Sequence, residues 1–128
     1  MTGLVENNFF SKCENQITKC VFPLENLQGM NYIALTINVG SSSEDIENAG
    51  IAHFLEHVQM NFFDKNEKRY LCSAYTDFYS TTYYFDVKDT ALECVIDIIQ
   101  NILKGKYLEM KDIEEVRADI LDEYKAYE

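Results

Sequence analysis

The chain has 128 residues, which is enough for one domain with a core of its own, and we expect residues 1–128 to form that single domain. Its 11 basic and 22 acidic residues give a formal net charge of −11, which disfavours nucleic acid and anionic membranes as partners. Hydrophobic residues make up 47% of the chain, which is typical of a globular protein, and no apolar run reaches the roughly 20 residues that span a bilayer.

The first half of the chain shows two strand patterns and one helix pattern. Residues 17–22 predict a short strand before Pro23, and residues 24–31 a connection. Residues 32–39 alternate between apolar and other side chains, which predicts a half-buried strand. Its inward face would hold Ile33, Leu35, Ile37 and Val39. Residues 46–62 have apolar positions at helical spacing, with Ser42, Ser43 and Asp45 as candidate caps and Gly50 as an alternative start.

The second half predicts a loop, a hairpin and two helices. Residues 64–69 are charged and indicate an exposed loop. Residues 70–76 and 80–87 favour two antiparallel strands joined at residues 77–79. Helices are predicted over residues 89–103 and 110–127. Their apolar positions are Leu92, Val95, Ile96, Ile99, Ile102 and Leu103 in the first, and Ile113, Val116, Ile120, Leu121, Tyr124 and Tyr127 in the second. The expected class is α+β: an antiparallel or mixed sheet with helices packed on one face.

The cysteines and the N-terminus bear on the compartment. No pair among Cys13, Cys20, Cys72 and Cys94 has C-x-x-C spacing, and an acid stands where a signal peptide would carry basic residues. We therefore expect a cytoplasmic protein with reduced, buried cysteines, and a Cys13–Cys20 bridge remains open.

The two histidines of the chain lie in one short segment, His53-Phe54-Leu55-Glu56-His57. Positions four apart on a helix lie one turn apart on the same face, so both imidazoles can face one zinc ion. Glu56 lies beside that point and can accept a proton from water there. A catalytic zinc needs a third protein ligand and an open position, and Glu123 in the last predicted helix is the candidate.

The histidine segment belongs to a series of separate sequence blocks. H-x-x-E-H is the inverzincin signature. The blocks are Thr36–Asp45 and Ala49–His57, then Ser73–Thr76, Thr81–Phe85 and Arg117–Glu123. Together, and in this order, they resemble the pitrilysin/insulinase family, which includes the mitochondrial processing peptidase. The resemblance covers the chain from about residue 30 onward. It implies that the fold is the first half of the family's catalytic domain.

The resemblance implies a role for each site residue. His53, His57 and Glu123 would bind Zn²⁺, and Glu56 would be the general base. The segment Ser73-Ala74-Tyr75 would pair with an extended substrate by strand addition.

Three features depart from the family. The gap between His57 and Glu123 is shorter than usual, Val116 stands where the family commonly has a second glutamate, and Ser73 replaces its asparagine. Glu115 lies about 100° round the helix from position 116 and is a poor substitute for the missing acid. Family members are also much longer, with a C-terminal part that grips substrate.

We therefore expect a zinc endopeptidase that cleaves a peptide or an unfolded polypeptide segment, such as a leader or precursor peptide. It would work as a homo-oligomer or with a second subunit. The alternative is a non-catalytic metal- or peptide-binding subunit that supports a longer homologue. A third interpretation is that the chain is a fragment of a longer enzyme.

Overall fold

A computed structural model describes residues 10–14, 17–21, 28–66, 69–106 and 108–127. Its central feature is an antiparallel sheet of three strands, β3 (Met30–Ile37), β4 (Tyr70–Thr76) and β5 (Thr81–Lys88). The order is β3-β5-β4, so the predicted hairpin of β4 and β5 is confirmed and β3 pairs along the other edge of β5. The predicted strand over residues 17–22 is β2 (Ile17–Val21), which pairs with a strand that was not predicted, β1 (Phe10–Glu14).

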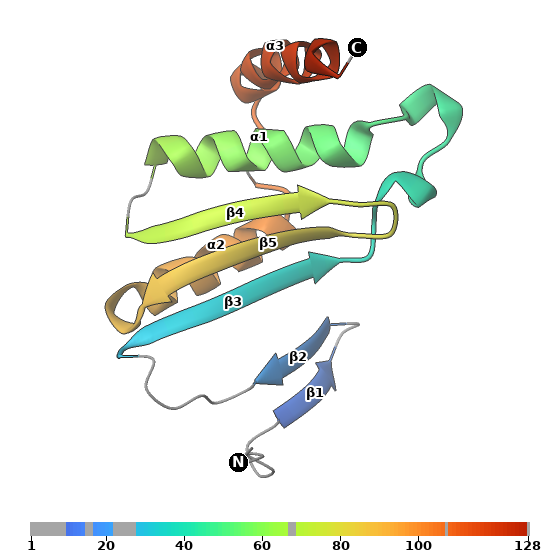
Figure 1. Cartoon of the computed structure of the whole chain (residues 1–128). Helices are drawn as coiled ribbons and strands as arrows, with labels where there is room; N and C mark the ends of the chain where they lie inside the picture. The colour runs from blue at the N-terminus through green and yellow to red at the C-terminus, as the bar shows by residue number, and fades with distance from the viewer. Residues whose placement is uncertain (1–9, 15–16, 22–27, 67–68, 107, 128) are drawn as a thin grey trace, which may run out of the picture.

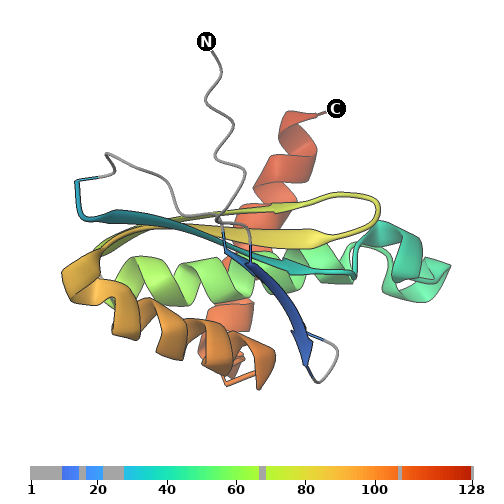
Figure 2. The same ribbon diagram turned by 90° about the horizontal axis from the view of Figure 1, so that it is seen from below.

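Two helices cover one face of this sheet, as Figures 1 and 2 show. They are α1 (Ile51–Asn66) and α2 (Leu92–Leu103), and the third helix, α3 (Met110–Ala126), packs against α1. Short 3-10 turns precede them: η1 (Ser41–Ser43), η2 (Ile46–Asn48) and η3 (Asp89–Ala91). The expected α+β class with helices on one face of the sheet is confirmed, and the sheet is antiparallel rather than mixed.

The alternation of β3 and β5 builds the core beneath the sheet. Tyr83, Phe85 and Val87 of β5 are buried against Val95, Ile98 and Ile102 of α2, and Ile33, Leu35 and Ile37 of β3 lie at the edge of this cluster. Val39 was expected on the same face but is exposed. The strand ends at Ile37, and the chain turns there, because the backbone N–H of Val39 donates to the carbonyl of Ile37.

The predicted inner faces of α2 and α3 are too wide. Ile96 and Leu103 of α2 are exposed, and Ile98, which was not assigned to that face, is buried. On α3, Val116 and Ile120 are buried and Ile113 is partly buried, whereas Leu121, Tyr124 and Tyr127 are exposed. The physical reason is that α3 packs on a single neighbouring helix, so only a narrow stripe of its surface is covered.

The start of α1 also differs from the prediction of a helix over residues 46–62. Residues 46–48 form η2, with the Asp45 carboxylate accepting from the N–H of Asn48, and α1 begins only at Ile51. Gly50 separates the two with φ of 90°, a left-handed conformation that favours glycine. At its other end α1 continues to Asn66, so residues 64–66 of the predicted loop are helical and residues 67–68 lie outside the described part.

Two further features are the absence of a membrane-spanning helix from the described residues and the state of the cysteines. No helix in the described part of the chain is long and apolar enough to cross a membrane. Cys72 and Cys94 are not joined in a disulfide and are half-buried, rather than buried as expected, and the side chains of Cys13 and Cys20 lie outside the described residues.

Candidate metal centre

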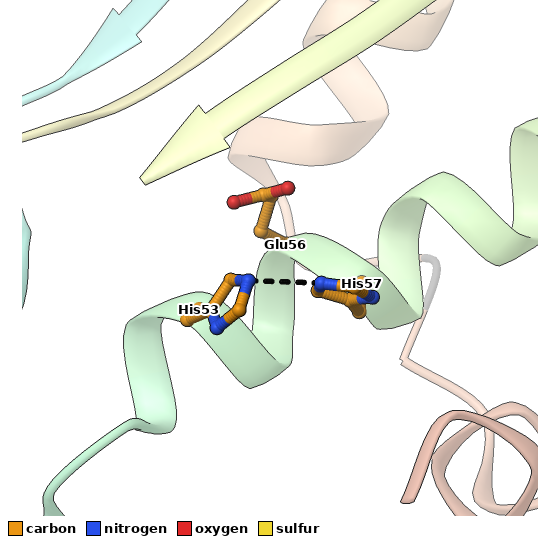
Figure 3. Close-up of side chains that lie close together, drawn as sticks. All are labelled: His53, Glu56 and His57. Atoms are coloured by element: carbon orange, nitrogen blue, oxygen red, sulfur yellow. Dashed lines mark hydrogen bonds between the residues drawn. The ribbon is translucent and has the colours of Figure 1, made fainter. Parts of the chain in front are cut away.

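Two imidazoles on the N-terminal half of α1 form the first part of the candidate metal centre. His53 and His57 lie one turn apart, and their Nε2 atoms are 2.9 Å from each other (Figure 3). Their ring centroids are 4.5 Å apart and the rings are nearly perpendicular. The helical spacing thus brings both ring nitrogens to one point, as the sequence predicted.

A carboxylate from α3 reaches the same point. Oε2 of Glu123 lies 3.4 Å from Nε2 of His57 and 3.9 Å from Nε2 of His53. The two helices therefore bring Glu123 beside two histidines that are far from it in the sequence. Their side chains are 34%, 30% and 40% exposed for His53, His57 and Glu123, so solvent reaches the centre.

These three donors fit a zinc ion. Ligands at 2.0–2.2 Å around a tetrahedral zinc lie about 3.3 Å from one another. The distances of 2.9, 3.4 and 3.9 Å scatter around that value. Two imidazole nitrogens and one carboxylate oxygen are also a donor set that catalytic zinc sites use, with one position left for water.

Glu56 belongs to the same cluster but faces another way. Donor atoms of His53, Glu56 and His57 all lie within 4.8 Å of one another. The Glu56 side chain is directed toward the sheet (Figure 3), is only 7% exposed, and its Oε2 accepts a hydrogen bond from the Thr76 hydroxyl at 2.5 Å. One oxygen of this carboxylate is therefore held by a protein donor, and the side chain is turned toward the sheet, whereas the Glu123 carboxylate lies at the two imidazoles.

The surroundings of Glu56 are dry. Tyr83 of β5 is 2% exposed, and burial, followed by the nearby Glu56 carboxylate, raises the pKa of its phenol well above the usual range. Tyr83 is therefore a neutral hydroxyl at physiological pH. Glu56 lies beside this buried phenol and is itself only 7% exposed, so its carboxylate is largely shielded from bulk water, which strengthens its hydrogen bonds.

A cavity of about 620 Å³ adjoins His53. Its wall includes Thr76, Asp77, Phe78 and Tyr124, from the end of β4, the following turn and α3. Hydrogen bonds from the backbone N–H groups of Ser80 and Tyr79 to the Asp77 carboxylate lower its pKa and shape this turn. The cavity gives a ligand room beside the His53 imidazole.

The turn after β4 is held against the segment that leads into α1. The N–H groups of Ser41 and Ser42 donate to the carbonyls of Asp77 and Phe78. A Cβ on Gly40 would lie 2.4 Å from the Asp77 carbonyl oxygen, so this close approach requires glycine.

Packing between α1 and α3 fixes the position of Glu123. Val58, the residue after His57, is fully buried against Val116 and Ile120 of α3. Val116 thus makes an apolar packing contact at the position where the family commonly has an acid. Glu115 accepts a hydrogen bond from the side chain of Asn61, so it ties α3 to α1.

The three predicted substrate-binding residues lie on β4, an edge strand of the three-stranded sheet. Ala74 is half-buried and packs against the core cluster, whereas its strand neighbours Ser73 and Tyr75 are exposed and alternate to the opposite face of the sheet. Thr76 ends the same strand beside Glu56, so the edge leads directly to the centre.

Two residues that support the centre were not predicted. Glu44 caps α1 across six residues: its Oε2 accepts from the N–H of Gly50 at 2.6 Å, and its Oε1 accepts from the N–H of Ala52 at 2.7 Å. The candidate caps Ser42 and Ser43 do not take this role. Thr76 binds Glu56 from another element. Neither contact follows from a local spacing rule, because each joins residues on separate elements.

Comparisons with known proteins give one family. The model of "Insulinase (Peptidase family M16)" matches residues 24–128. The beta subunit of the mitochondrial-processing peptidase of Caenorhabditis elegans is 35% identical over 101 residues, which cover 71% of this chain and 22% of that protein. A probable zinc protease of Haemophilus influenzae, PqqL, is 28% identical over 111 residues, covering 73% and 12%. The chain thus spans about a fifth or less of the length of these relatives.

A solved structure supports the fold. The crystal structure of a protease from Helicobacter pylori aligns with a TM-score of 0.73 over 91% of this chain and 30% of that chain. The sequence identity is 23%, so this likeness concerns the architecture alone.

Proposed function

The chain belongs to the insulinase family, peptidase family M16, as its motifs predicted, and from that premise we propose that it is the metal-bearing part of a zinc-dependent endopeptidase. The substrate would be a peptide or an unfolded polypeptide segment, such as a leader or precursor peptide. The observation that carries this proposal is the approach of Glu123 on α3 to within 3.9 Å of both imidazoles on α1.

His53, His57 and Glu123 would hold the zinc ion. When bound, zinc polarises the scissile carbonyl and makes water a stronger nucleophile at neutral pH. The role of these three residues is to fix the ligand geometry on two packed helices. Their partial exposure leaves one side open to water and substrate.

Glu56 would act as the general base and acid. Its carboxylate lies beside the imidazoles and is nine-tenths buried, so it is held in place rather than free to rotate in solvent. It would accept the proton of the attacking water and later give it to the leaving amine.

β4 would hold the substrate. In an antiparallel pair, the backbone N–H and C=O groups of successive residues point alternately toward the partner strand and away from it. The N–H of Asp77 donates to the carbonyl of Ser80, so Asp77 faces β5, and by this alternation Ala74 and Thr76 direct their backbone groups to the open edge. An extended substrate can pair there and lead its scissile bond toward Glu56.

A partner chain would complete the active enzyme. The matched segments cover only 12% to 22% of these relatives, and several of the relatives are named as subunits. We propose that the chain works in a homo-oligomer or with a second subunit, and that it resides in the cytoplasm. The alternative role, a non-catalytic subunit that binds metal or peptide for a longer homologue, is decided by the same experiment.

The experiment combines metal analysis with a peptide-cleavage assay on the purified chain, alone and mixed with candidate partner chains. We expect about one zinc per chain in the wild type. Glu123→Gln should lose zinc, whereas the matched control Glu114→Gln, an exposed acid on the same helix, should retain it. Glu56→Gln should retain zinc and lose cleavage.

The outcomes separate the two roles. Zinc binding without cleavage in any mixture, with Glu56→Gln and wild type equally inert, would support the non-catalytic subunit. Equal zinc content in Glu123→Gln and wild type would refute the proposed ligand set.

A further inference from the structure

The hydroxyl group of Thr76 lies within hydrogen-bond distance of two oxygens, Oε2 of Glu56 and the hydroxyl of Thr81. It donates to Oε2 of Glu56 at 2.5 Å, a length typical of a hydrogen bond to an ionised carboxylate. Thr76 is the last residue of β4, and Glu56 lies on α1, so this bond joins the end of the edge strand to the helix that carries the imidazoles.

Thr76 has only one hydroxyl proton to donate, because each threonine hydroxyl carries a single proton. Thr81, which lies opposite Thr76, donates its hydroxyl proton to the carbonyl of Val39 at 2.9 Å. The two hydroxyl oxygens lie 3.3 Å apart, and neither has a second proton for that contact. An ionised Glu56 accepts only, so the proton between Thr76 and Glu56 belongs to Thr76.

This arrangement leaves the two oxygens of Glu56 unequal. Oε2 is held by Thr76, whose side chain is half-buried at the end of β4, and Glu56 on α1 is 7% exposed. Oε1 is the oxygen without this donor. Rotation of the carboxylate would break a short hydrogen bond in a dry environment, which is costly.

We propose that Thr76 is a positioning residue that fixes the Glu56 carboxylate by Oε2, so that Oε1 is the oxygen that exchanges protons during catalysis. The proposal rests on the proposed peptidase function for its catalytic part. In that reaction an O–H bond of water breaks, its proton forms a bond to Oε1, and the water oxygen bonds to the scissile carbon while the C=O π pair moves onto the carbonyl oxygen and later re-forms the carbonyl. The C–N bond then breaks, and the proton moves from Oε1 to the leaving nitrogen. Thr76 keeps its own proton throughout.

The position of Thr76 also connects substrate pairing to the base. The same strand that would pair with substrate ends in the residue that orients Glu56. A loss of this contact should therefore lower kcat more than it changes KM, because the substrate-pairing backbone of β4 remains in place.

The test uses Thr76→Val, which keeps the β-branched shape and removes the hydroxyl, and Thr76→Ser, which restores it. Thr36→Val is the matched control, since Thr36 shares a hydroxyl contact with Thr82 on neighbouring strands of the same sheet. The first readout is independent of activity: crystal structures of the wild type and the three variants. We expect the Glu56 carboxylate to turn away from β4 in Thr76→Val only.

The second readout is kinetic, with zinc affinity and urea unfolding measured alongside. We expect Thr76→Val to lower kcat by about tenfold to a hundredfold, as loss of an outer hydrogen-bond partner does at metal sites. KM should change less than about threefold, and Thr76→Ser should restore kcat. A carboxylate that stays in place in Thr76→Val, or a Thr76→Ser variant as slow as Thr76→Val, would overturn the proposal. An inert wild type whose Glu56 turns in Thr76→Val would instead refute the peptidase function and support the positioning contact.

Discussion

Glu44 is predicted to stabilise the start of α1, and the change Glu44→Gln tests this. The Glu44 carboxylate accepts two short hydrogen bonds, from the N–H groups of Gly50 and Ala52, at the end of α1 where helix N–H groups lack partners. The glutamine retains one acceptor oxygen and presents an NH₂ group to the other N–H. One of the two bonds is therefore lost.

The expected loss of stability follows from these two contacts. A hydrogen bond to a charged group contributes about 1.5–3 kcal/mol, and a helix cap about 0.5–2 kcal/mol. Because Glu44 and Gly50 are only half-buried, water replaces part of the lost bond, and we expect the free energy of unfolding to fall by about 1–2 kcal/mol. His53 lies in the first turn of α1, so zinc affinity should weaken as well.

Urea unfolding followed by circular dichroism measures the first effect, and competition with a chelator measures the second. The matched control is Glu47→Gln, which removes the same charge from an exposed position of η2. This control should stay within about 0.5 kcal/mol of the wild type. Equal stability of the two variants would show that the long-range cap does not hold the helix start.

Two further predictions concern packing and pH. Val58→Ala removes two methyl groups from a fully buried side chain between α1 and α3, so urea unfolding should show a loss of about 2–3 kcal/mol, and zinc affinity should fall because Glu123 loses its support. The exposed Leu121→Ala should cost less than about 1 kcal/mol, and equal losses would contradict the packing argument. Hydrogen bonds lower the pKa of Asp77 below its ordinary value of 3.8. The charged carboxylate therefore stabilises the folded turn at pH values above 3.8, and this contribution is lost as the pH falls through the lower pKa of the folded state. The stability difference between wild type and Asp77→Asn, measured by urea unfolding across pH, should therefore shrink in acid, and a difference that does not change with pH would refute the argument.

The local parts of the fold and of the centre were predictable from the sequence. The positions of His53 and His57 four residues apart determine that their imidazoles converge once a helix forms, and the structure bears this out at 2.9 Å. The hairpin of β4 and β5 was predicted from two segments rich in strand-forming residues on either side of the short connection at residues 77–79. The order of the family blocks also identified the family, which the match over residues 24–128 confirms. Helical and strand periodicity are short-range properties, so a single sequence carries them. The roles assigned to the site residues remain predictions.

Contacts between elements were decided only by the tertiary structure. Periodicity offered six apolar positions on α3, but packing against one helix buries only the stripe around Val116 and Ile120. That packing brings Glu123 to the imidazoles, whereas Glu44 and Thr76 reach α1 from separate segments. Residues far apart in the chain meet where side-chain volumes and hydrogen bonds are satisfied together, and no spacing rule along one chain expresses that condition.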